Sequence, residues 1–545
     1  MLMKTTLFIV VTLLLGIASG TTIHAAEGEI KLIGAVEGAR NRTRMPVDVV
    51  GDVIIVGVHD VDVNNLAGAG RIFTRNRRKW EQTAELVAHD RNVDQPKPGQ
   101  SGFGFAVSLS GRTGRTIADY AIIGAPGDDG AAKDAGAAYI YAFSGKNWKQ
   151  EMKITAADAL AGDAFGFVVS IDGTVAVVGA PKADVGAAKN AGAAYVFVRD
   201  ANRWKQHTKL IPKDLARSDA LGEAVDIQKD TAIIGAPGHT HDGVRFAGAV
   251  FVFVREGDAW REQAKLTADD AAPSDRFGVS VDIEGDTIIV GSLLNDAGGT
   301  KDAGAAYIFI RDGNTWKQGA KLIAPGKKKG DHFGAGVATT GKIAVVGAPL
   351  REEGGLGAGA AYSFVNVDGV WNNARTVVPD DAAPNLVFGS TVAISGDTIV
   401  VASGAAPEVA AGFANGTAAY VYSGEEHFGT PPFAVQPFGL KIETLGQVKR
   451  AALYQNYPNP FNPETWIPYC LPIDAPVRFR IYNIRGQLMR ELNLGSQAAG
   501  YYLTRESAAH WDGRDELGEI VSSGVYFYTL QAGAFQATRR MLIMK

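Results

Sequence analysis

RFGVSVDIEGDTIIVGSLLNDAGGTKDAGAAYIFIRDGNTWKQGAKLIA, residues 276–324, is one copy of a unit that recurs, with drift, seven times along the 545-residue chain. Two landmarks keep its register. Tryptophans recur 55 or 56 residues apart, at Trp148, Trp204, Trp260, Trp316 and Trp371. A Phe-Gly or Leu-Gly pair recurs 55 to 62 residues apart, at Phe103, Phe165, Leu221, Phe277, Phe333 and Phe388. A fixed period of about 50 residues is typical of propellers, solenoids and repeat arrays.

Each unit contains four strand-like runs. FGVSVDI alternates apolar with small or polar residues, GD follows it, and TIIVGS runs back as a second strand. GAAYIFIR and TWKQGAKLIA follow, joined by DGN. Gly-Asp and Asp-Gly between such runs indicate hairpins, because these residues tolerate the positive φ of tight turns. We therefore expect an all-β fold of four-stranded antiparallel sheets, stacked in a ring as a β-propeller.

The two ends of the repeat region indicate how the ring closes. The last unit, residues 388–422, has no fourth strand, because a Pro-rich stretch unsuited to a central strand follows it. The missing strand has a counterpart before the first unit, in EIKLIGAVE. Leu32 is 19 residues from Gly51, as Leu266 is from Gly285. We expect residues 29–36 to form the outer strand of the last blade, in a seven-bladed propeller over 27–424.

The repeats resemble those of a known family, the FG-GAP repeats of integrin α-type propellers. The resemblance rests on FGFAVS with GAP at Phe103 and Gly124, FGFVVS with GAP at Phe165 and Gly179, and GAP at Gly235 and Gly347. It implies the propeller fold together with adhesion, ligand-binding or accessory roles.

Integrin-type relatives bind calcium in the loop between the first two strands, with acidic residues at alternate positions. In the second unit Asp119 matches the last acidic position, but the preceding ones hold Arg112, Thr113, Gly114 and Arg115. The other units have shorter loops. We therefore expect no calcium there, and we assign no metal ligand and no cofactor.

Composition and the N-terminus indicate an exported protein. Residues 1–26 contain Lys4, an apolar run and then small residues, as in a secretory signal peptide cleaved near Ala25 or Ala26, or after Gly20. No later stretch is long and apolar enough for a transmembrane helix. The net charge of −4 gives no basic surface for nucleic acid. A single cysteine, Cys470, allows no internal disulfide.

The C-terminal region differs in character. Residues 425–448 read as a Pro-rich linker, and 449–545 as a small all-β sandwich of Ig-like size. NYPNPFNPET, IYNIRGQLMREL and the final RRMLIMK resemble the C-terminal sorting domains of type IX secretion cargo, and the middle resembles the Ig-like domain of flagellar hook-capping proteins. The resemblance implies a partner in the secretion machinery, with release or attachment at the cell surface. A plain spacer is the alternative.

Two long connections in each unit, after the second and the fourth strand, are predicted to share one rim of the propeller. Function on scaffolded folds concentrates in such loops, although Asp, Gly and Asn are also ordinary turn formers. The residues predicted to bind a ligand there are Asp128, Asp129, Asp134, His239, His241, Asp242, Arg245, Asn295, Asp296, Arg351 and Glu352.

The sequence favours a secreted or surface-displayed, non-enzymatic binding or adhesion protein, whose ligand is an extracellular glycan or protein. No nucleophile-elbow, zincin or phosphate-loop motif is present, so we assign no catalytic residue. Two alternatives stay open: an enzyme acting on extracellular polysaccharide in the propeller funnel, and a structural component of a surface layer.

Overall fold

The computed structural model describes most of the chain. The described residues are 29–33, 45–59, 68–76, 79–90, 101–111, 118–201, 203–352, 356–367, 369–379, 381–382, 384–404, 418–423, 451–454, 456, 464–502 and 507–543. The predicted signal peptide and the predicted linker lie outside them, as do Arg112, Thr113, Gly114 and Arg115.

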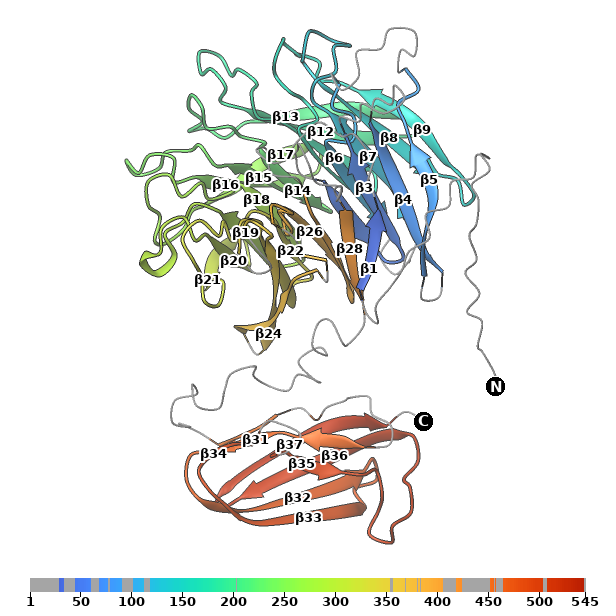
Figure 1. The fold of residues 1–545 in the computed structure, drawn as a ribbon, viewed down its shortest axis with the longest axis vertical. Helices are drawn as coiled ribbons and strands as arrows, with labels where there is room; N and C mark the ends of the chain where they lie inside the picture. The colour runs from blue at the N-terminus through green and yellow to red at the C-terminus, as the bar shows by residue number, and fades with distance from the viewer. Residues whose placement is uncertain are drawn as a thin grey trace, which may run out of the picture.

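Repeated four-stranded antiparallel sheets make up the N-terminal region (Figure 1). Six of them, among the described residues, take their strands consecutively from the chain. These are β2 to β5 (Val47–Val50, Val53–Val58, Ala69–Asn76, Lys79–Leu86), β6 to β9 (Ala106–Gly111, Ala118–Ala125, Ala137–Phe143, Trp148–Ile154), β10 to β13 (Val168–Asp172, Val175–Ala180, Ala193–Asp200, Arg203–Leu210), β14 to β17 (Ala224–Gln228, Thr231–Ala236, Ala249–Glu256, Ala259–Leu266), β18 to β21 (Ser280–Glu284, Thr287–Ser292, Ala305–Asp312, Thr315–Leu322) and β22 to β25 (Val337–Thr339, Ile343–Ala348, Ala360–Val367, Val370–Val377).

The seventh sheet joins the two ends of the repeat region. It contains β26 (Thr391–Ser395), β27 (Thr398–Ala402), β28 (Ala418–Ser423) and β1 (Glu29–Ile33). Strand β1 pairs antiparallel with β28, with Glu29 opposite Tyr422, and the two lie side by side in Figure 1. The pairing predicted for this N-terminal segment is thus confirmed over Glu29–Ile33.

The first strands of the seven sheets form a closed circuit within the described residues. Strands β2, β6, β10, β14, β18, β22 and β26 contact one another in that order, and β26 contacts β2. The predicted β-propeller is confirmed. We number its blades one to seven from β2–β5 to the sheet that contains β1.

The cores of the propeller lie between neighbouring blades. Phe165 is fully buried and meets Tyr195 edge-on, in a cluster that also contains Ile122 and Ile140 of the preceding blade. Trp204 packs edge-on against Tyr120 of that preceding blade, so this copy of the recurring tryptophan packs between blades. Each such buried aromatic side chain stabilises the fold by about 2 kcal/mol.

The glycines of the FG and GAP motifs are required for the same steric reason. A Cβ on Gly124, in the GAP of blade two, would lie 2.0 Å from the carbonyl oxygen of Gly166, in the FG of blade three. Gly179 and Gly222 repeat this approach at 2.1 Å. Gly166 also has φ near 87°, which disfavours side chains. Neighbouring backbones therefore meet where the motifs face each other, and only glycine fits there.

The backbone N–H groups on the free edge of each first strand also need hydrogen-bond acceptors, since unpaired N–H groups there are costly or attract other strands. Side chains of the preceding blade do this at equivalent positions. The backbone N–H of Leu109 donates to Asp48 Oδ2 at 2.7 Å, and that of Ile283 donates to Asp226 Oδ2 at 2.9 Å. We call Asp48, Ser108, Ser170, Asp226 and Asp282 the inner ring; all five accept such a bond.

The C-terminal region is also built of strands, which form three sheets in its described part. One has the order β33-β32-β36-β37, another β29-β31-β34, and a third pairs β30 with β35. The bounds are β29 (Ala452–Leu453), β30 (Thr465–Ile467), β31 (Tyr469–Leu471), β32 (Ala475–Asn483), β33 (Leu488–Gln497), β34 (Gly500–Tyr502), β35 (Ala509–Trp511), β36 (Gly524–Ala532) and β37 (Phe535–Ile543). Side chains from all three sheets share one core, which includes Phe479, Trp511 and Tyr528. Cys470 is buried.

Within the described part of the chain, no helix is long and apolar enough to cross a membrane.

Candidate functional site

The long connections of the propeller meet at one end, which we call the loop rim. It consists of the described residues of the segments that follow the second and the fourth strand of each blade. Their backbones are bonded to each other: Phe165 N donates to Ala135 O at 2.8 Å, and Gly162 N to Lys133 O at 2.9 Å. The prediction that both kinds of connection share a rim is confirmed by these bonds.

One position in each loop after the second strand is turned inward. It is the third residue after the alanine or serine that ends that strand, and we call it the buried loop position. It is buried at Asp128, Ala183, His239, Asn295 and Arg351. Four of the residues predicted to bind a ligand, Asp128, His239, Asn295 and Arg351, are therefore buried.

Three of these side chains bind an acid in the connection that enters the same blade. His239 Nδ1 lies 2.8 Å from Asp219 Oδ2, Asn295 Nδ2 2.7 Å from Asp275 Oδ2, and Arg351 Nη1 2.7 Å from Asp331 Oδ2. Each acid also accepts a backbone N–H of its own connection, as Asp219 does from Ala216. These acid-centred contacts fix the frame of the loop rim, because a polar group buried without a partner is costly.

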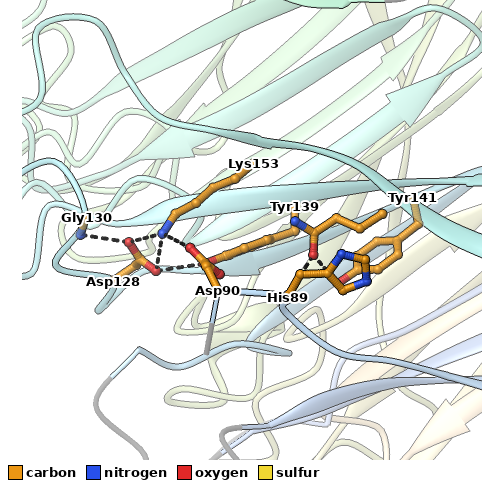
Figure 2. A network of polar contacts seen from close by, with 8 residues as sticks. His89, Asp90, Asp128, Gly130, Tyr139, Tyr141 and Lys153 are labelled. Carbon is orange, nitrogen blue, oxygen red and sulfur yellow. Dashed lines mark hydrogen bonds and ion pairs between the residues drawn. The ribbon is translucent and has the colours of Figure 1, made fainter. Parts of the chain in front are cut away.

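Asp128 is held differently, in a network with Lys153, Tyr139 and Asp90 (Figure 2). Lys153 Nζ lies 2.9 Å from Asp128 Oδ1 and 2.7 Å from Asp90 Oδ2, and Tyr139 donates its hydroxyl to Asp128 at 2.9 Å. Burial opposes ionisation of Asp90, but Lys153 outweighs it and lowers the pKa of that carboxyl. Burial, reinforced by the charge of Asp128, raises the pKa of Tyr139, so the phenol stays a neutral donor.

The lysine of this network recurs in other blades, always paired with an aspartate from the connection that enters the blade. Lys209 meets Asp158 at 2.7 Å, Lys265 meets Asp214 at 2.6 Å and Lys321 meets Asp270 at 2.5 Å. Lys31 on β1 makes the corresponding pair with Asp381. Since the aspartate follows the last strand of the previous blade, these ion pairs link consecutive blades. We assign them a structural role.

The remaining predicted residues reach the surface to different degrees. Exposed side chains are Asp129, Asp134, Asp242, Arg245, Asp296 and Glu352, and His241 is half-buried. Two of the aspartates also close their own loops. Asp129 Oδ1 accepts the N–H of Asp134 and Asp296 Oδ1 that of Asp302, each at 2.8 Å.

Blade four carries the most varied exposed chemistry among these loops. The Arg245 guanidinium lies over the ring of Phe246 at 5.4 Å from its centroid, and the ring is 41% exposed. His241 Nδ1 lies 3.2 Å from Asp242 Oδ2. A cation, an anion and an apolar ring are therefore exposed on one loop, which is a set suited to recognising a polar ligand with an apolar face.

A second feature, which the sequence patterns did not predict, is an aromatic cluster between the end of β3 and the starts of β6 and β10. His59, Phe105 and Phe167 come from three consecutive blades, with ring centroids 5.2 and 5.0 Å apart. In blade four Glu223 stands where the phenylalanines do, and it accepts two hydrogen bonds from Arg276, at 2.9 and 3.1 Å. An aromatic residue two positions after Phe103 and Phe165 was the signal available in the sequence.

Three carboxyls of the inner ring, those of Asp48, Asp226 and Asp282, have a raised pKa. Burial raises the pKa of Asp48 to about 6, against the effect of its backbone hydrogen bonds. Burial and the neighbouring charge of Asp226 raise the pKa of Asp282 well above its ordinary value. Burial also raises the pKa of Asp226. These acids bind backbone N–H groups of the next blade, so we assign them to the packing of the blades.

Among the described residues, no group of three or more His, Cys, Asp or Glu side chains is arranged to hold a metal ion.

Comparison with known families agrees with the architecture. The FG-GAP repeat model matches residues 80–141, 148–197, 204–253, 260–309, 316–364 and 371–422, more than half of the chain. The chain therefore belongs to the family of proteins with FG-GAP repeats. Each matched segment spans the fourth strand of one blade and the first three of the next. A search of curated proteins finds no match.

Proposed function

We propose that this protein is a secreted or cell-surface, non-enzymatic binding protein that contacts an extracellular glycan or protein through the loop rim. FG-GAP repeats often occur in adhesion and ligand-binding proteins. The observation that carries the proposal is that the buried and the exposed side chains of the rim loops have different roles. Buried contacts such as Asn295–Asp275 hold the frame, while the exposed side chains differ from blade to blade.

The exposed apolar residues of the rim support the same reading. Phe246, Leu350 and Leu356 are exposed in loops after second strands, and Leu356 is 68% exposed. Singly exposed apolar residues are common on protein surfaces, but in loops of this kind they are available to contact a ligand. We therefore place the binding surface on blades four to six, with Arg245 and Phe246 as the first residues to test.

A binding array tests this proposal. Purified full-length protein is applied to immobilised glycans and matrix proteins, with and without a chelator, beside the double variant Arg245→Ala/Phe246→Ala. We expect saturable, chelator-insensitive binding that the double variant weakens at least tenfold. Arg261→Ala, an exposed residue on outer strand β17, is the matched control. Binding by the double variant equal to that of the native protein would remove this surface from consideration.

Two other outcomes favour the alternatives. Self-association of the purified protein without any binding to the array would favour a surface-layer component. Release of sugars from a polysaccharide substrate would favour an enzyme with its site in the propeller funnel.

We further propose that the C-terminal region, an Ig-like domain in our interpretation, directs export or attachment. Its resemblance to type IX sorting domains supports this, as does a hydrophobic core made of its own strands. A chain ending at residue 423 is compared with the full chain by fractionation of cells and medium. We expect the truncated chain to stay inside the outer membrane. Equal release of both chains would show the region to be a spacer.

A further inference from the structure

The buried loop position of blade five has surroundings that no other blade repeats in the described part of the chain. Lys321 Nζ donates a hydrogen bond to Asn295 Oδ1 at 2.8 Å, while Asn295 Nδ2 donates to Asp275 Oδ2 at 2.7 Å. Asn295 and Asp275 are both buried. Because Oδ1 is bonded to Cγ, the amine lies beside the carboxamide carbon and the carboxyl touches the amide nitrogen.

We propose that Lys321 and Asn295 form an intramolecular amide bond, with Asp275 as the catalytic acid and base. The Lys321 ammonium gives up a proton and its nitrogen attacks Asn295 Cγ. A bond forms between Nζ and Cγ, and the bond between Cγ and Nδ2 breaks. The amide nitrogen leaves as ammonia and takes up a proton. One ammonium and one carboxamide thus become one secondary amide and one ammonium ion, with no change of oxidation state.

Asp275 is placed for both proton transfers. Its Oδ2 accepts a hydrogen bond from Asn295 Nδ2, the nitrogen that leaves, and a second one from the backbone N–H of Ala272, at 3.1 Å. Burial raises the pKa of Asp275 even though the hydrogen bond from Asn295 opposes this. A carboxyl that is more readily protonated can donate to the departing nitrogen and then accept the proton of the attacking one.

Asp270 positions the nucleophile. Its Oδ2 lies 2.5 Å from Lys321 Nζ, and its Oδ1 accepts the hydroxyl of Tyr307 at 2.9 Å. The amine is therefore held between Asp270 and the carboxamide. The side chain of Asp270 is half exposed, at 52%, so the first proton of the ammonium can pass through it to water. Holding reactants in contact is a large part of the acceleration of such reactions.

Equivalent positions in other blades lack one or more of the three groups. In blade two Lys153 contacts Asp128, but Ser101 stands at the position of Asp275, two residues before the phenylalanine. In blade three the buried loop position is Ala183. Blades four and six have His239 and Arg351 there, which offer no carboxamide. The lysine, carboxamide and buried acid therefore come together in blade five alone, among the blades in which the structure describes this position.

The bond would join the loop that follows β19 to β21, the outer strand of the same blade. The outer strand would then stay attached to the loop rim even when its ladder with β20 opens. A cross-link of this kind resists unfolding chiefly by restricting the unfolded chain.

Peptide mapping by mass spectrometry tests the proposal on the full-length protein. We expect a digest of the native protein to contain one branched peptide joining the segments with Asn295 and Lys321, lighter than their sum by one ammonia. Lys321→Arg should abolish it, and Asp275→Ala should slow its formation at least tenfold. Lys153→Arg, the matched control in blade two, should leave it unchanged.

Three results would overturn the proposal. The first is recovery of the two native segments as separate, unmodified peptides after prolonged incubation at neutral pH. The second is loss of ammonia that persists in Lys321→Arg, because that marks cyclisation of an asparagine on its own backbone. The third, cross-linking of Asp275→Ala at the native rate, would remove Asp275 from the reaction. Even if a variant fails to fold, the peptide map of the native protein still shows whether the bond between Lys321 and Asn295 has formed.

Discussion

Removing the side chain of Leu32 tests how the propeller closes. Leu32 lies on β1, opposite Ala419 of β28, and is fully buried in a cluster that includes Val49 and Val400 from blades one and seven. Truncating a buried leucine to alanine removes burial and leaves a cavity, which costs about 2–5 kcal/mol. If β1 is a full member of the last blade, Leu32→Ala lowers the free energy of unfolding by about 3 kcal/mol.

Leu210 provides the matched comparison. It occupies the same place on β13, opposite Ala194, and is equally buried. We expect Leu32→Ala and Leu210→Ala to destabilise the propeller to within about 1 kcal/mol of each other, since the two sites have the same chemistry and packing.

Urea unfolding followed by tryptophan fluorescence measures both variants. The transition of the C-terminal region is assigned separately from the chain that ends at residue 423, because two domains need not unfold together. A loss of less than about 0.5 kcal/mol for Leu32→Ala, beside a full loss for Leu210→Ala, would be a typical surface effect. It would refute the closure of the ring by β1.

Further changes test other parts of the fold. Gly124→Ala places a Cβ 2.0 Å from the carbonyl oxygen of Gly166, so we expect little soluble folded protein. Gly319→Ala should fold, because the nearest atom to its Cβ is a side-chain carbon of Ile310 at 3.2 Å, and the Ile308 carbonyl oxygen lies at an ordinary 3.8 Å. Circular dichroism of both variants tests this. The pKa of Asp48 is raised to about 6 in the folded protein. The stability that this carboxyl contributes is therefore present below its pKa in the unfolded chain and is lost as pH rises through its pKa in the folded protein. Between about pH 4 and pH 7 the free energy of unfolding of the native protein should therefore fall by up to about 3 kcal/mol relative to that of Asp48→Asn. Parallel pH profiles of the free energy of unfolding for the two proteins would contradict this. Lys209→Met removes a partly exposed ion pair with Asp158 that links two blades. We expect the stability measured by thermal unfolding to fall by about 1 kcal/mol or less, and by less still in high salt. A larger loss that does not depend on salt would contradict this.

The fold could be predicted from the sequence because each blade repeats the same local signals. Strand alternation, hairpin turns and the Phe-Gly landmarks are local, and the absence of a last outer strand indicated β1 through the spacing of Leu32 and Gly51. The steric reason for the glycines could not be predicted, since Gly124 and Gly166 belong to different blades and meet only in the assembled ring.

The inward orientation of the buried loop position could not be predicted, because no residue type marks it. It holds Asp128, Ala183, His239, Asn295 and Arg351, most of which are usually exposed. Its partners gave a clearer signal, since an acid two residues before the Phe or Leu landmark recurs at Asp163, Asp219, Asp275 and Asp331. Aligning the repeats on this acid would have shown that polar loop residues face inward to meet it.

The pairing of β1 with β28 also determines when the molecule can finish folding. Glu29 and its partner Tyr422 are separated by almost the whole repeat region, whereas every other blade pairs strands that are adjacent in sequence. Among the described strands of the propeller, β1 is made first and can pair last, so it stays unpaired until β28 has been made. Contacts of such long separation form slowly, and exposed strand edges invite aggregation. A chaperone that shields β1 would therefore protect this protein through the whole period in which the ring is open.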